Sequence, residues 1–293
     1  MLGIGDDGAI VREESGNSIV VTTDVLNAGV HFPESTDAKA IAYKSLAVNL
    51  SDLAAMGATP SWFTMTLSLP EASEDWLTRF ASGLFELAQE SEIALIGGDT
   101  VRGPLSIGIQ AMGQIVTGTE LMRSGACPGD SIYISGTLGD AALALKKISG
   151  NEEIESPLRK RLDYPVPRID LGNRLRGIAS SCIDISDGLV ADLDHLLEAS
   201  KVGANITTAL LPVSEYLMAV EQEQAILMAL TGGDDYELCF TVPAKHARSI
   251  DGISRELGLK LTRIGEITSD PGLRLTDSSV SLDRQGYRHF SGR

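Results

Sequence analysis

Aspartates stand at the ends of predicted strands and in glycine-rich turns of this chain. Asp24 ends the segment SIVVTTD, and Asp99 follows two glycines in IALIGGDT. Asp184 and Asp187 flank the turn of CIDISDGL, and the Gly-Gly-Asp pattern returns at Asp234 in GGDD. In α/β folds ligands gather at strand ends, where glycine lets the backbone approach a phosphate. A single Asp in such a place is more often a turn former or a helix N-cap, so the set as a whole indicates a site.

The amino-terminal stretch MLGIGDDGAI has the glycine spacing of a dinucleotide-binding loop. Gly3, Gly5 and Gly8 match G-x-G-x-x-G, but no strand precedes them and the inner positions are Asp6 and Asp7. Two carboxylates repel a pyrophosphate by about 4 kcal/mol per pair of unit charges at 4 Å and an effective dielectric of 20. A divalent cation between them removes that conflict. The stretch by itself favours a polar Asp-Gly turn over a metal site.

A third carboxylate lies on a helix that is otherwise largely apolar. The segment 37–57, DAKAIAYKSLAVNLSDLAAMG, predicts a helix closed by Gly57. Ser45, Asn49 and Asp52 fall at i, i+4 and i+7 on one stripe of it. A carboxylate on an apolar helix requires a metal or a cationic partner, unless the stripe faces water. The spacing does not decide between these two interpretations.

Several standard catalytic signatures are absent from the sequence. There is no Walker G-x-x-x-x-G-K-[ST] loop, no H-R-D or D-F-G set of a protein kinase, and no H-E-x-x-H. The segment from Asp184 to Gly188 lacks the alternating oxygen ligands of an EF-hand. Oxygen-rich sites made of Asp and Thr suit magnesium, so we expect a magnesium protein.

Composition narrows the class of protein further. The chain has 293 residues, 43% of them hydrophobic, and a formal net charge of -16, which argues against nucleic acids and anionic membranes as partners. The three cysteines, Cys127, Cys182 and Cys239, form no C-x-x-C pair, which predicts reduced thiols in a cytoplasm. No apolar run reaches the length of a membrane helix and no leader precedes the first motif, so we expect a cytoplasmic protein.

Alternating strand and helix patterns predict an α/β protein of two domains. We place the boundary in the Gly-, Ser- and Thr-rich segment 117–130, giving an amino-terminal domain 1–118 and a carboxy-terminal domain 119–293. The predicted strands are 18–24, 93–100, 105–116, 131–136, 181–184, 204–210, 236–242 and 261–268. The predicted helices are 37–57, 74–91, 141–148, 190–200 and 223–230, with one more between the last two strands.

The ordered set of motifs resembles one family. GIGDDGA, TTD, AYKSLAVNLSDLAAMGA, GGDTVRGP, RSGACPGD, SGTLGD, DISDGL and GGDDYELCFT have the order and spacing of the thiamine-monophosphate kinases, within the aminoimidazole ribonucleotide synthetase superfamily. The resemblance covers nearly the whole chain. It implies two α/β (α+β) domains, each a mixed sheet with helices on one face. The first domain would bind ATP and magnesium and form a homodimer, and the second would complete the nucleotide and substrate site.

The resemblance also implies an activity and a set of site residues. The γ-phosphate of ATP would pass directly to thiamine monophosphate, giving thiamine diphosphate and ADP, with several Mg²⁺ ions as cofactor and no catalytic side chain. It assigns the metal ions to Asp7, Thr22, Thr23, Asp24, Asp52, Asp99, Asp184 and Asp187. It assigns ATP to Gly98, Asp99, Arg123 and Ser186, and the thiamine substrate to His31, Asp234 and Arg284. Lys44 and Arg102 also lie inside matching motifs. The one role that we consider for them is an ion pair with a phosphate group.

This sequence departs from the family pattern at three places. Family members usually carry further residues before GIGDD, which suggests a shortened or misplaced start here. The usual Glu of GGEDYE is Asp234, and an aromatic residue before the carboxy-terminal KGY is replaced by Arg284 in LDRQGYRHF. Asp234 has a shorter reach to the substrate than Glu, and the change at Arg284 concerns the thiamine end directly.

Other functions stay open on sequence grounds. Selenophosphate synthetase would call for a reactive Cys or selenocysteine near the glycine-rich start, and the hydrogenase-maturation dehydratase for a carboxy-terminal Cys; the sequence has neither. A non-catalytic module that binds Mg-nucleotide and a phosphohydrolase with paired metals are alternatives from other classes.

Overall fold

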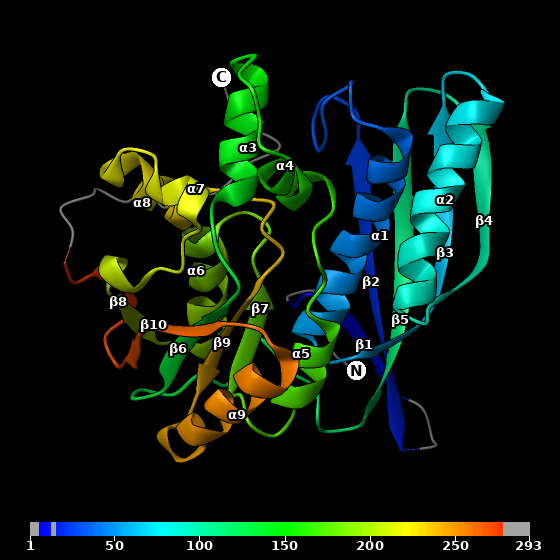
Figure 1. The fold of residues 1–293 in the computed structure, drawn as a ribbon. Coiled ribbons are helices and arrows are strands. Elements are labelled where there is room, and N and C mark those ends of the chain that lie inside the picture. Colours follow the sequence, from blue (N-terminus) through cyan, green and yellow to red (C-terminus); the bar gives the residue numbers. More distant parts are fainter. Residues whose placement is uncertain (1–5, 13–15, 278–293) are drawn as a thin grey trace. The chain divides into compact units, whose positions relative to one another are not determined.

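The computed structural model describes residues 6–12 and 16–277, which form two compact units (Figure 1). Residues 1–120 and 163–169 make up the first unit, and residues 121–162 and 170–293 make up the second. Each unit contains one mixed β-sheet with helices, as expected from the sequence. Among the described residues, no helix has the length and apolar character needed to cross a membrane.

The first unit is a five-stranded sheet with the order β1-β2-β5-β3-β4. Its strands are β1 (Ala9–Arg12), β2 (Asn17–Asn27), β3 (Thr59–Leu69), β4 (Ala94–Arg102) and β5 (Ser106–Val116). Neighbouring strands are antiparallel except β3 and β4, which are parallel. The central β5 buries every second side chain from Ile107 to Ile115, so one face of the sheet carries the core.

Two helices, α1 (Ala38–Ala55) and α2 (Glu74–Glu90), belong to this unit. Helix α1 is buried almost all round, because Ala, Leu and Val occupy most of its positions, and it contacts both β2 and β5. It also packs closely on α2: a Cβ on Gly83 would stand 2.1 Å from the Lys39 carbonyl oxygen. A glycine is therefore required at that crossing.

Four strands of this sheet differ from the prediction: β1 and β3 were not predicted, β2 continues past Asp24 to Asn27, and β4 continues past Thr100. Strand β3 was not predicted, although Thr59–Leu69 is the centre of the β5-β3-β4 pairing. The strand predicted over 93–100 continues as β4 to Arg102, because Asp99 and its neighbours pair in parallel with β3 as far as Leu69. Asp99 therefore lies within a strand and not in the loop after it.

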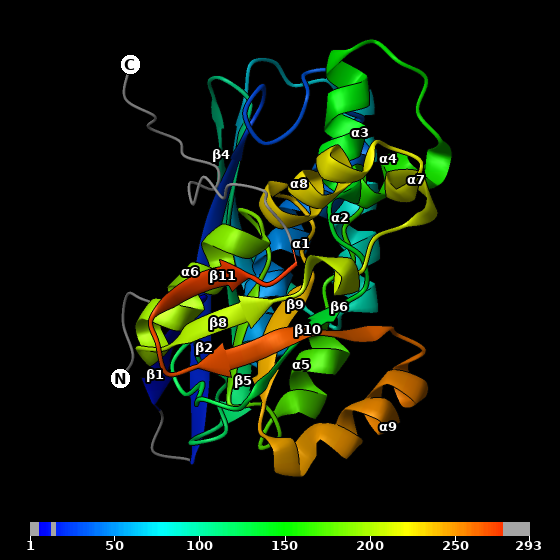
Figure 2. The ribbon, with the colours of Figure 1, turned by 90° about the vertical axis from the view of Figure 1, so that its left-hand side faces the viewer.

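The second unit is a six-stranded sheet with the order β11-β8-β10-β6-β9-β7. Figure 2 shows β11, β8 and β10 side by side, with β11 and β8 parallel and the other neighbours antiparallel. Its strands are β6 (Ser131–Ser135), β7 (Ser181–Asp184), β8 (Gly203–Ile206), β9 (Leu238–Val242), β10 (Leu261–Thr268) and β11 (Gly272–Leu275). The α-helices that follow β6 in the chain are α3 (Asp140–Ser149), α4 (Ser156–Asp163), α5 (Ile169–Leu175), α6 (Leu189–Ser200), α7 (Glu215–Met218), α8 (Gln222–Thr231) and α9 (Ala247–Leu257).

The second unit also buries a group of charged side chains, which we call the Arg161 cluster: Asp140, Arg161, Asp235 and Glu237. The three acids are each at most 2% exposed. Arg161 Nη2 lies 3.1 Å from Glu237 Oε1, and Arg161 Nε lies 3.7 Å from Asp140 Oδ2. Burial raises the pKa of Asp235 well above its ordinary value, and the backbone N–H of Gly139 and the Arg161 charge only partly oppose this. Asp235 therefore keeps its proton to a higher pH than an exposed aspartate does.

This proton predicts how stability depends on pH. In the unfolded chain Asp235 has its ordinary pKa of 3.8, whereas in the folded state its pKa is higher. The proton on Asp235 therefore contributes fully to the free energy of unfolding below pH 3.8, and this contribution is lost as the pH rises through the raised pKa. Asp235→Asn has no titrating group at this position, so its unfolding free energy should lack the pH-dependent part that comes from Asp235. Urea unfolding of both proteins between pH 4 and pH 8 measures the difference, with the exposed Asp270→Asn as control. Equal pH slopes for wild type and Asp235→Asn would contradict the assignment.

Candidate metal and nucleotide site

Strand β2 divides the predicted ligands of the TTD motif between its two faces. Thr22 and Asp24 alternate with Thr23 along the strand, so they point to opposite sides. Thr22 is buried at 8% exposure, whereas Thr23 is exposed and its hydroxyl donates to the Ile109 carbonyl oxygen at 3.0 Å. The structure thus brings the side chains of Thr22 and Asp24 to one face, and that of Thr23 to the other.

The polar stripe of α1 packs against β2 and not against water. Ser45 and Asn49 are at most 1% exposed. Asn49 donates from Nδ2 to the Ser45 carbonyl oxygen at 3.0 Å, and its Oδ1 accepts the Asp24 backbone N–H at 3.1 Å. Strand β1 pairs with β2 only as far as Val21 and does not reach Asp24. Asn49 Oδ1 therefore provides the acceptor for the Asp24 N–H. The water-facing interpretation is wrong for Ser45 and Asn49.

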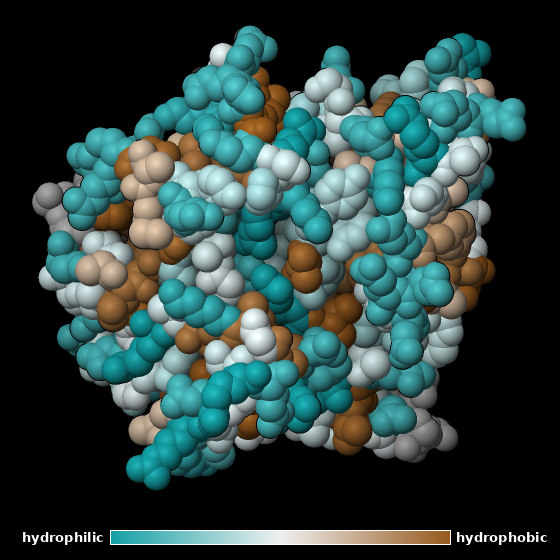
Figure 3. All heavy atoms as spheres, viewed as in Figure 1, coloured by the Kyte–Doolittle hydropathy of each residue, from teal (hydrophilic) through white to brown (hydrophobic). Residues whose placement is uncertain are grey.

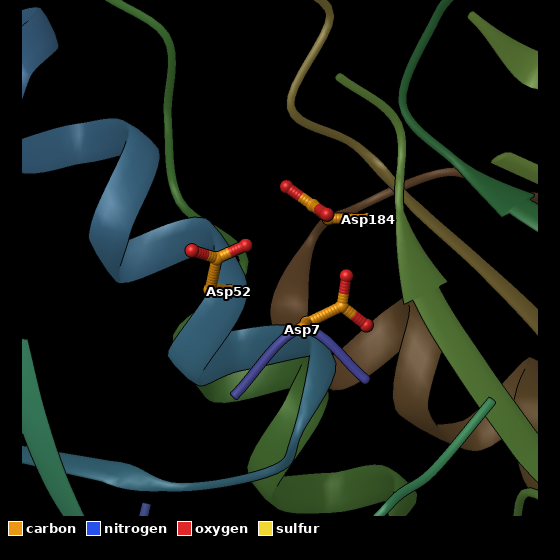
Figure 4. A group of neighbouring side chains, drawn as sticks. All are labelled: Asp7, Asp52 and Asp184. Atoms are coloured by element: carbon orange, nitrogen blue, oxygen red, sulfur yellow. The ribbon is translucent and has the colours of Figure 1, made fainter. Parts of the chain in front are cut away.

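Asp7 and Asp52 bring two carboxylates together in the first unit. Figure 4 shows them side by side, and each has an oxygen within 4.8 Å of one on the other. Thr22 Oγ1 donates to Asp52 Oδ2 at 2.5 Å, so one oxygen of Asp52 is held against β2. Asp7 is 8% exposed and Asp52 is half-buried, so their repulsion is only partly screened by water. Hard oxygen donors held this close fit a divalent cation such as Mg²⁺.

Gly8 explains part of the glycine pattern at the amino terminus. A Cβ at Gly8 would stand 2.7 Å from Val20 Cγ1, so the glycine lets the segment after Asp7 lie against β2. Its structural role is this close approach. Gly3 and Gly5 lie outside the described residues.

Gly98 and Asp99 lie on β4, at the edge of the same sheet. A Cβ at Gly98, whose φ is +155°, would stand 2.0 Å from the Met65 carbonyl oxygen, so pairing with β3 requires glycine. Asp99 is exposed, and its Oδ1 accepts the Thr100 N–H at 2.8 Å. Strand β4 lies three strand spacings from β2, about 14 Å across the sheet. Within this unit the structure does not bring Asp99 to Asp24.

His31 lies in the loop after β2, where two bonds hold it. Its Nδ1 accepts the Asn27 backbone N–H at 3.0 Å, so Nδ1 is the unprotonated ring nitrogen in this arrangement. The buried Lys44 of α1 donates from Nζ to the His31 carbonyl oxygen at 3.2 Å. Lys44 therefore has a positioning contact that the sequence did not indicate.

In the second unit, β7 leads into the DISDG turn. Asp184 ends the strand at 4% exposure, and Ser186 and Asp187 are half-buried in the turn. One oxygen of Asp192, Oδ2, accepts the backbone N–H groups of Ser186, Asp187 and Gly188 at 3.0, 3.0 and 3.1 Å. Asp192 is itself buried on the first turns of α6, so it fixes the shape of the turn.

The GGDD loop lies directly against the same turn. The Asp234 N–H donates to the Ser186 carbonyl oxygen at 2.8 Å, and the Tyr236 N–H donates to the Ile185 carbonyl oxygen at 2.8 Å. Asp234 thus lies on a segment that adjoins Asp184, Ser186 and Asp187, although it is far from them in the sequence.

Arg123 belongs to a segment that runs beside β7. The N–H of Cys182 donates to the Met122 carbonyl oxygen at 2.9 Å, and Ser200 Oγ donates to the Arg123 carbonyl oxygen at 2.9 Å. Arg123 therefore lies close to the start of β7. Arg284, the remaining predicted substrate residue, lies outside the described residues.

Sequence reasoning missed Asp192 and Asp235 as positioning residues. Asp192 follows Gly188 by four residues in DGLVAD, a spacing that lets a helical carboxylate reach back to the turn before the helix. Asp235 was noted only as part of GGDD. Neither aspartate was assigned a role from the sequence, because the aspartates were considered as ligands and not as acceptors for backbone N–H groups.

Comparison with known proteins agrees with the two mixed sheets. Residues 5–115 match the AIR synthase related protein N-terminal domain, and residues 127–278 match the corresponding C-terminal domain. These matches cover most of the chain and define the class as AIR synthase related. Hydrogenase maturation protein HypE from E. coli has the same fold, with a TM-score of 0.71 at 23% identity.

More similar relatives define the group within that class. Thiamine-monophosphate kinase from Escherichia coli (strain K12) is 47% identical, over 99% of this chain and 92% of the relative. The crystal structure of thiamine-monophosphate kinase from Stenotrophomonas maltophilia K279a matches with a TM-score of 0.88 and 48% identity, covering 96% of this chain and 92% of that one. AaThiL complexed with AMPPCP and TMP matches with a TM-score of 0.87 and 34% identity, covering 98% and 92%. The chain belongs to the thiamine-monophosphate kinase family.

The Asp192 contacts predict a large loss of stability when they are removed. Asp192→Ala leaves three buried or half-buried N–H groups without their acceptor, and we expect the unfolding free energy to fall by about 3 kcal/mol. Urea unfolding measures this loss, with Glu198→Ala, exposed on the same helix, as the matched control. A loss no greater than that of Glu198→Ala would show that the turn keeps its shape without Asp192.

Proposed function

We propose that this chain transfers the γ-phosphate of ATP to thiamine monophosphate, giving thiamine diphosphate and ADP. The observation that carries the proposal is the paired carboxylates Asp7 and Asp52, held beside Thr22 in a chain that belongs to this family. The complex of AaThiL with AMPPCP and TMP supports the choice of both substrates.

Magnesium is the proposed cofactor. Asp7, Asp52, Thr22 and Asp24 supply oxygen donors from one side of the first unit, which is the donor chemistry that Mg²⁺ prefers. The remaining proposed ligands are Asp99, Asp184 and Asp187, whereas the Thr23 side chain lies on the opposite face of β2 from Thr22 and Asp24. When bound, Mg²⁺ neutralises phosphate charge and orients the transferred group.

The other assignments concern the two organic substrates. ATP is assigned to Gly98, Asp99, Arg123 and Ser186, and thiamine monophosphate to His31, Asp234 and Arg284. In functional terms, we assign residues 1–118 to ATP, metal and dimer formation, and residues 119–293 to completing the nucleotide and substrate site.

The reaction requires no general base from the chain. The acceptor is a phosphate monoester whose second pKa is about 6, so at neutral pH it is largely a dianion and already a nucleophile. The barrier is the approach of one anion to another, so the residues act by binding and aligning the two phosphates. Asp7 and Asp52 serve as charge-bearing ligands in this scheme and donate no proton.

We also propose that the chain is a cytoplasmic homodimer that pairs through its first unit. Strand β4 is an edge strand and all of its residues are exposed, so its outer edge can pair with a strand of a second copy. Leu95, Ile96 and Val101 of β4 and Phe85 of α2 are exposed apolar side chains. Figure 3 shows apolar side chains on this part of the surface, at the right of the view. A second copy would cover them.

The direct test is the reaction itself. Incubation with Mg-ATP and thiamine monophosphate should consume ATP only when the acceptor is present, with thiamine diphosphate and ADP identified by mass. Equal ATP hydrolysis with and without the acceptor would point instead to a phosphohydrolase. Nucleotide binding without turnover would point to a binding module.

The metal assignment predicts the effect of one isosteric substitution. Asp52→Asn keeps the volume but removes a charge from the carboxylate pair, so kcat should fall by about 100-fold at limiting Mg²⁺ while the unfolding midpoint is retained. Asp75→Asn, whose side chain is 82% exposed in the same unit, is the control and should keep wild-type kcat. Near wild-type activity of Asp52→Asn would remove Asp52 from the metal site.

A further inference from the structure

The loop that carries Asp234 has an unusual backbone. It connects α8 to β9, and both Asp234 (φ +69°) and Tyr236 (φ +50°) adopt the left-handed conformation that L residues disfavour. Such a conformation persists only where the surroundings specify it. The bonds from the N–H groups of Asp234 and Tyr236 to Ser186 and Ile185 are part of that specification.

Gly233 allows the loop to approach the DISDG turn so closely. A Cβ at Gly233 would stand 2.5 Å from the Ser186 carbonyl oxygen. The Tyr236 hydroxyl then donates to Asp234 Oδ1 at 3.0 Å, so the carboxylate of Asp234 has a defined direction. The direction depends on both left-handed residues keeping their conformation.

Asp235 lies between these two residues and points into the unit. It is 2% exposed, and its Oδ2 accepts the Gly139 N–H at 2.8 Å. Gly139 has a φ of +84° at the start of α3, and a Cβ there would stand 2.9 Å from Leu217 Cδ2 and 3.0 Å from the Ala229 nitrogen. The Asp235 carboxyl therefore ties the loop to a turn that is itself fixed by close packing.

This contact is costly as a purely structural device. Within the described part of the chain, Asp235 Oδ1 has no hydrogen-bond partner, and the Arg161 cluster holds three buried acids around one guanidinium. An apolar side chain would fill the same space without that cost. An apolar side chain could not accept the Gly139 N–H, and it is this hydrogen bond that sets where the loop lies.

We propose that Asp235 is a positioning residue for thiamine-phosphate recognition: by binding the Gly139 N–H it fixes the loop so that Asp234 faces the substrate. The inference rests on the proposed function, because Asp234 is assigned to the substrate there. Asp235 itself touches no substrate. Its effect passes through the Asp234 backbone and through the Tyr236 hydroxyl.

The test separates the two substrates in steady-state kinetics. Asp235→Ala should raise the KM for thiamine monophosphate about tenfold and leave the KM for ATP within about twofold, because it removes the acceptor of one buried N–H. Asp235→Asn should restore the wild-type KM, since its amide oxygen accepts the same N–H. In an Asp234→Ala background, Asp235→Ala should add no further increase, because the residue through which it acts is gone.

A matched control distinguishes positioning from general destabilisation. Asp130 is also buried in the second unit, where its Oδ2 accepts the Cys127 N–H at 3.0 Å, away from the loop. Asp130→Ala should lower the unfolding midpoint without changing the ratio of the two KM values. Should Asp235→Ala not be recovered folded, Asp235→Ser replaces it, since its shorter side chain also leaves Gly139 without its acceptor.

The outcomes also separate this inference from the proposed function. Wild-type protein without thiamine-monophosphate kinase activity would overturn the proposed function and the inference with it. An active wild type in which the Asp235 variants change both KM values equally, or in which Asp235→Asn fails to restore the KM, would overturn the inference alone.

Discussion

The proposed metal site in the first unit depends on holding two carboxylates close together. Asp7 and Asp52 have oxygens within 4.8 Å although Asp7 is buried and Asp52 is half-buried, so water screens the repulsion between like charges only in part. The fold holds them there by burying α1 on nearly every side and by setting Thr22 against Asp52. Gly8 lets the Asp7 segment approach β2, and Asn49 joins α1 to the Asp24 backbone. An arrangement that concentrates negative charge in this way is suited to holding a cation between anions.

The second unit uses buried aspartates for a different purpose. Asp192 and Asp235 accept backbone N–H groups and so determine the paths of two loops. These loops carry Ser186, Asp187 and Asp234, the residues assigned to ligands. The acids of the chain thus fall into two kinds. Some present their oxygens at a proposed site. Others are buried and hold the ligand-bearing loops in place.

This division suits the chemistry that we propose. Transfer between two phosphates needs alignment and charge neutralisation more than it needs a proton donor or acceptor. A rigid loop backbone and fixed carboxylates meet that need. The formal charge of -16 is consistent with it too, since an acidic protein binds anions through metal ions and not through a basic surface.

Much of the fold was predictable from local patterns. The helices near 37–57, 74–91 and 190–200 agree with α1, α2 and α6 to within two residues at each end, because Ala- and Leu-rich periodicity and the capping residues around them are local signals. Strand β3 was missed although its residues are typical of a strand, and β4 was ended too early, since only pairing between the two extends them to Leu69 and Arg102. Strand pairing joins residues distant in the chain, and the sequence carries no direct record of it.

For the site, the sequence by itself determined which residues carry oxygen ligands and, through the ordered motifs, the family to which the chain belongs. Tertiary structure alone decided which of them meet. It brought Asp7 to Asp52 and Asp234 to the DISDG turn, sent Thr23 to the opposite face of β2, and left Asp99 at the sheet edge. It also decided that Asp192 and Asp235 bind backbone. The physical reason is that an aspartate has the same chemistry everywhere in a sequence, whereas its role depends on whether a cation site or a buried N–H lies within reach of its oxygens.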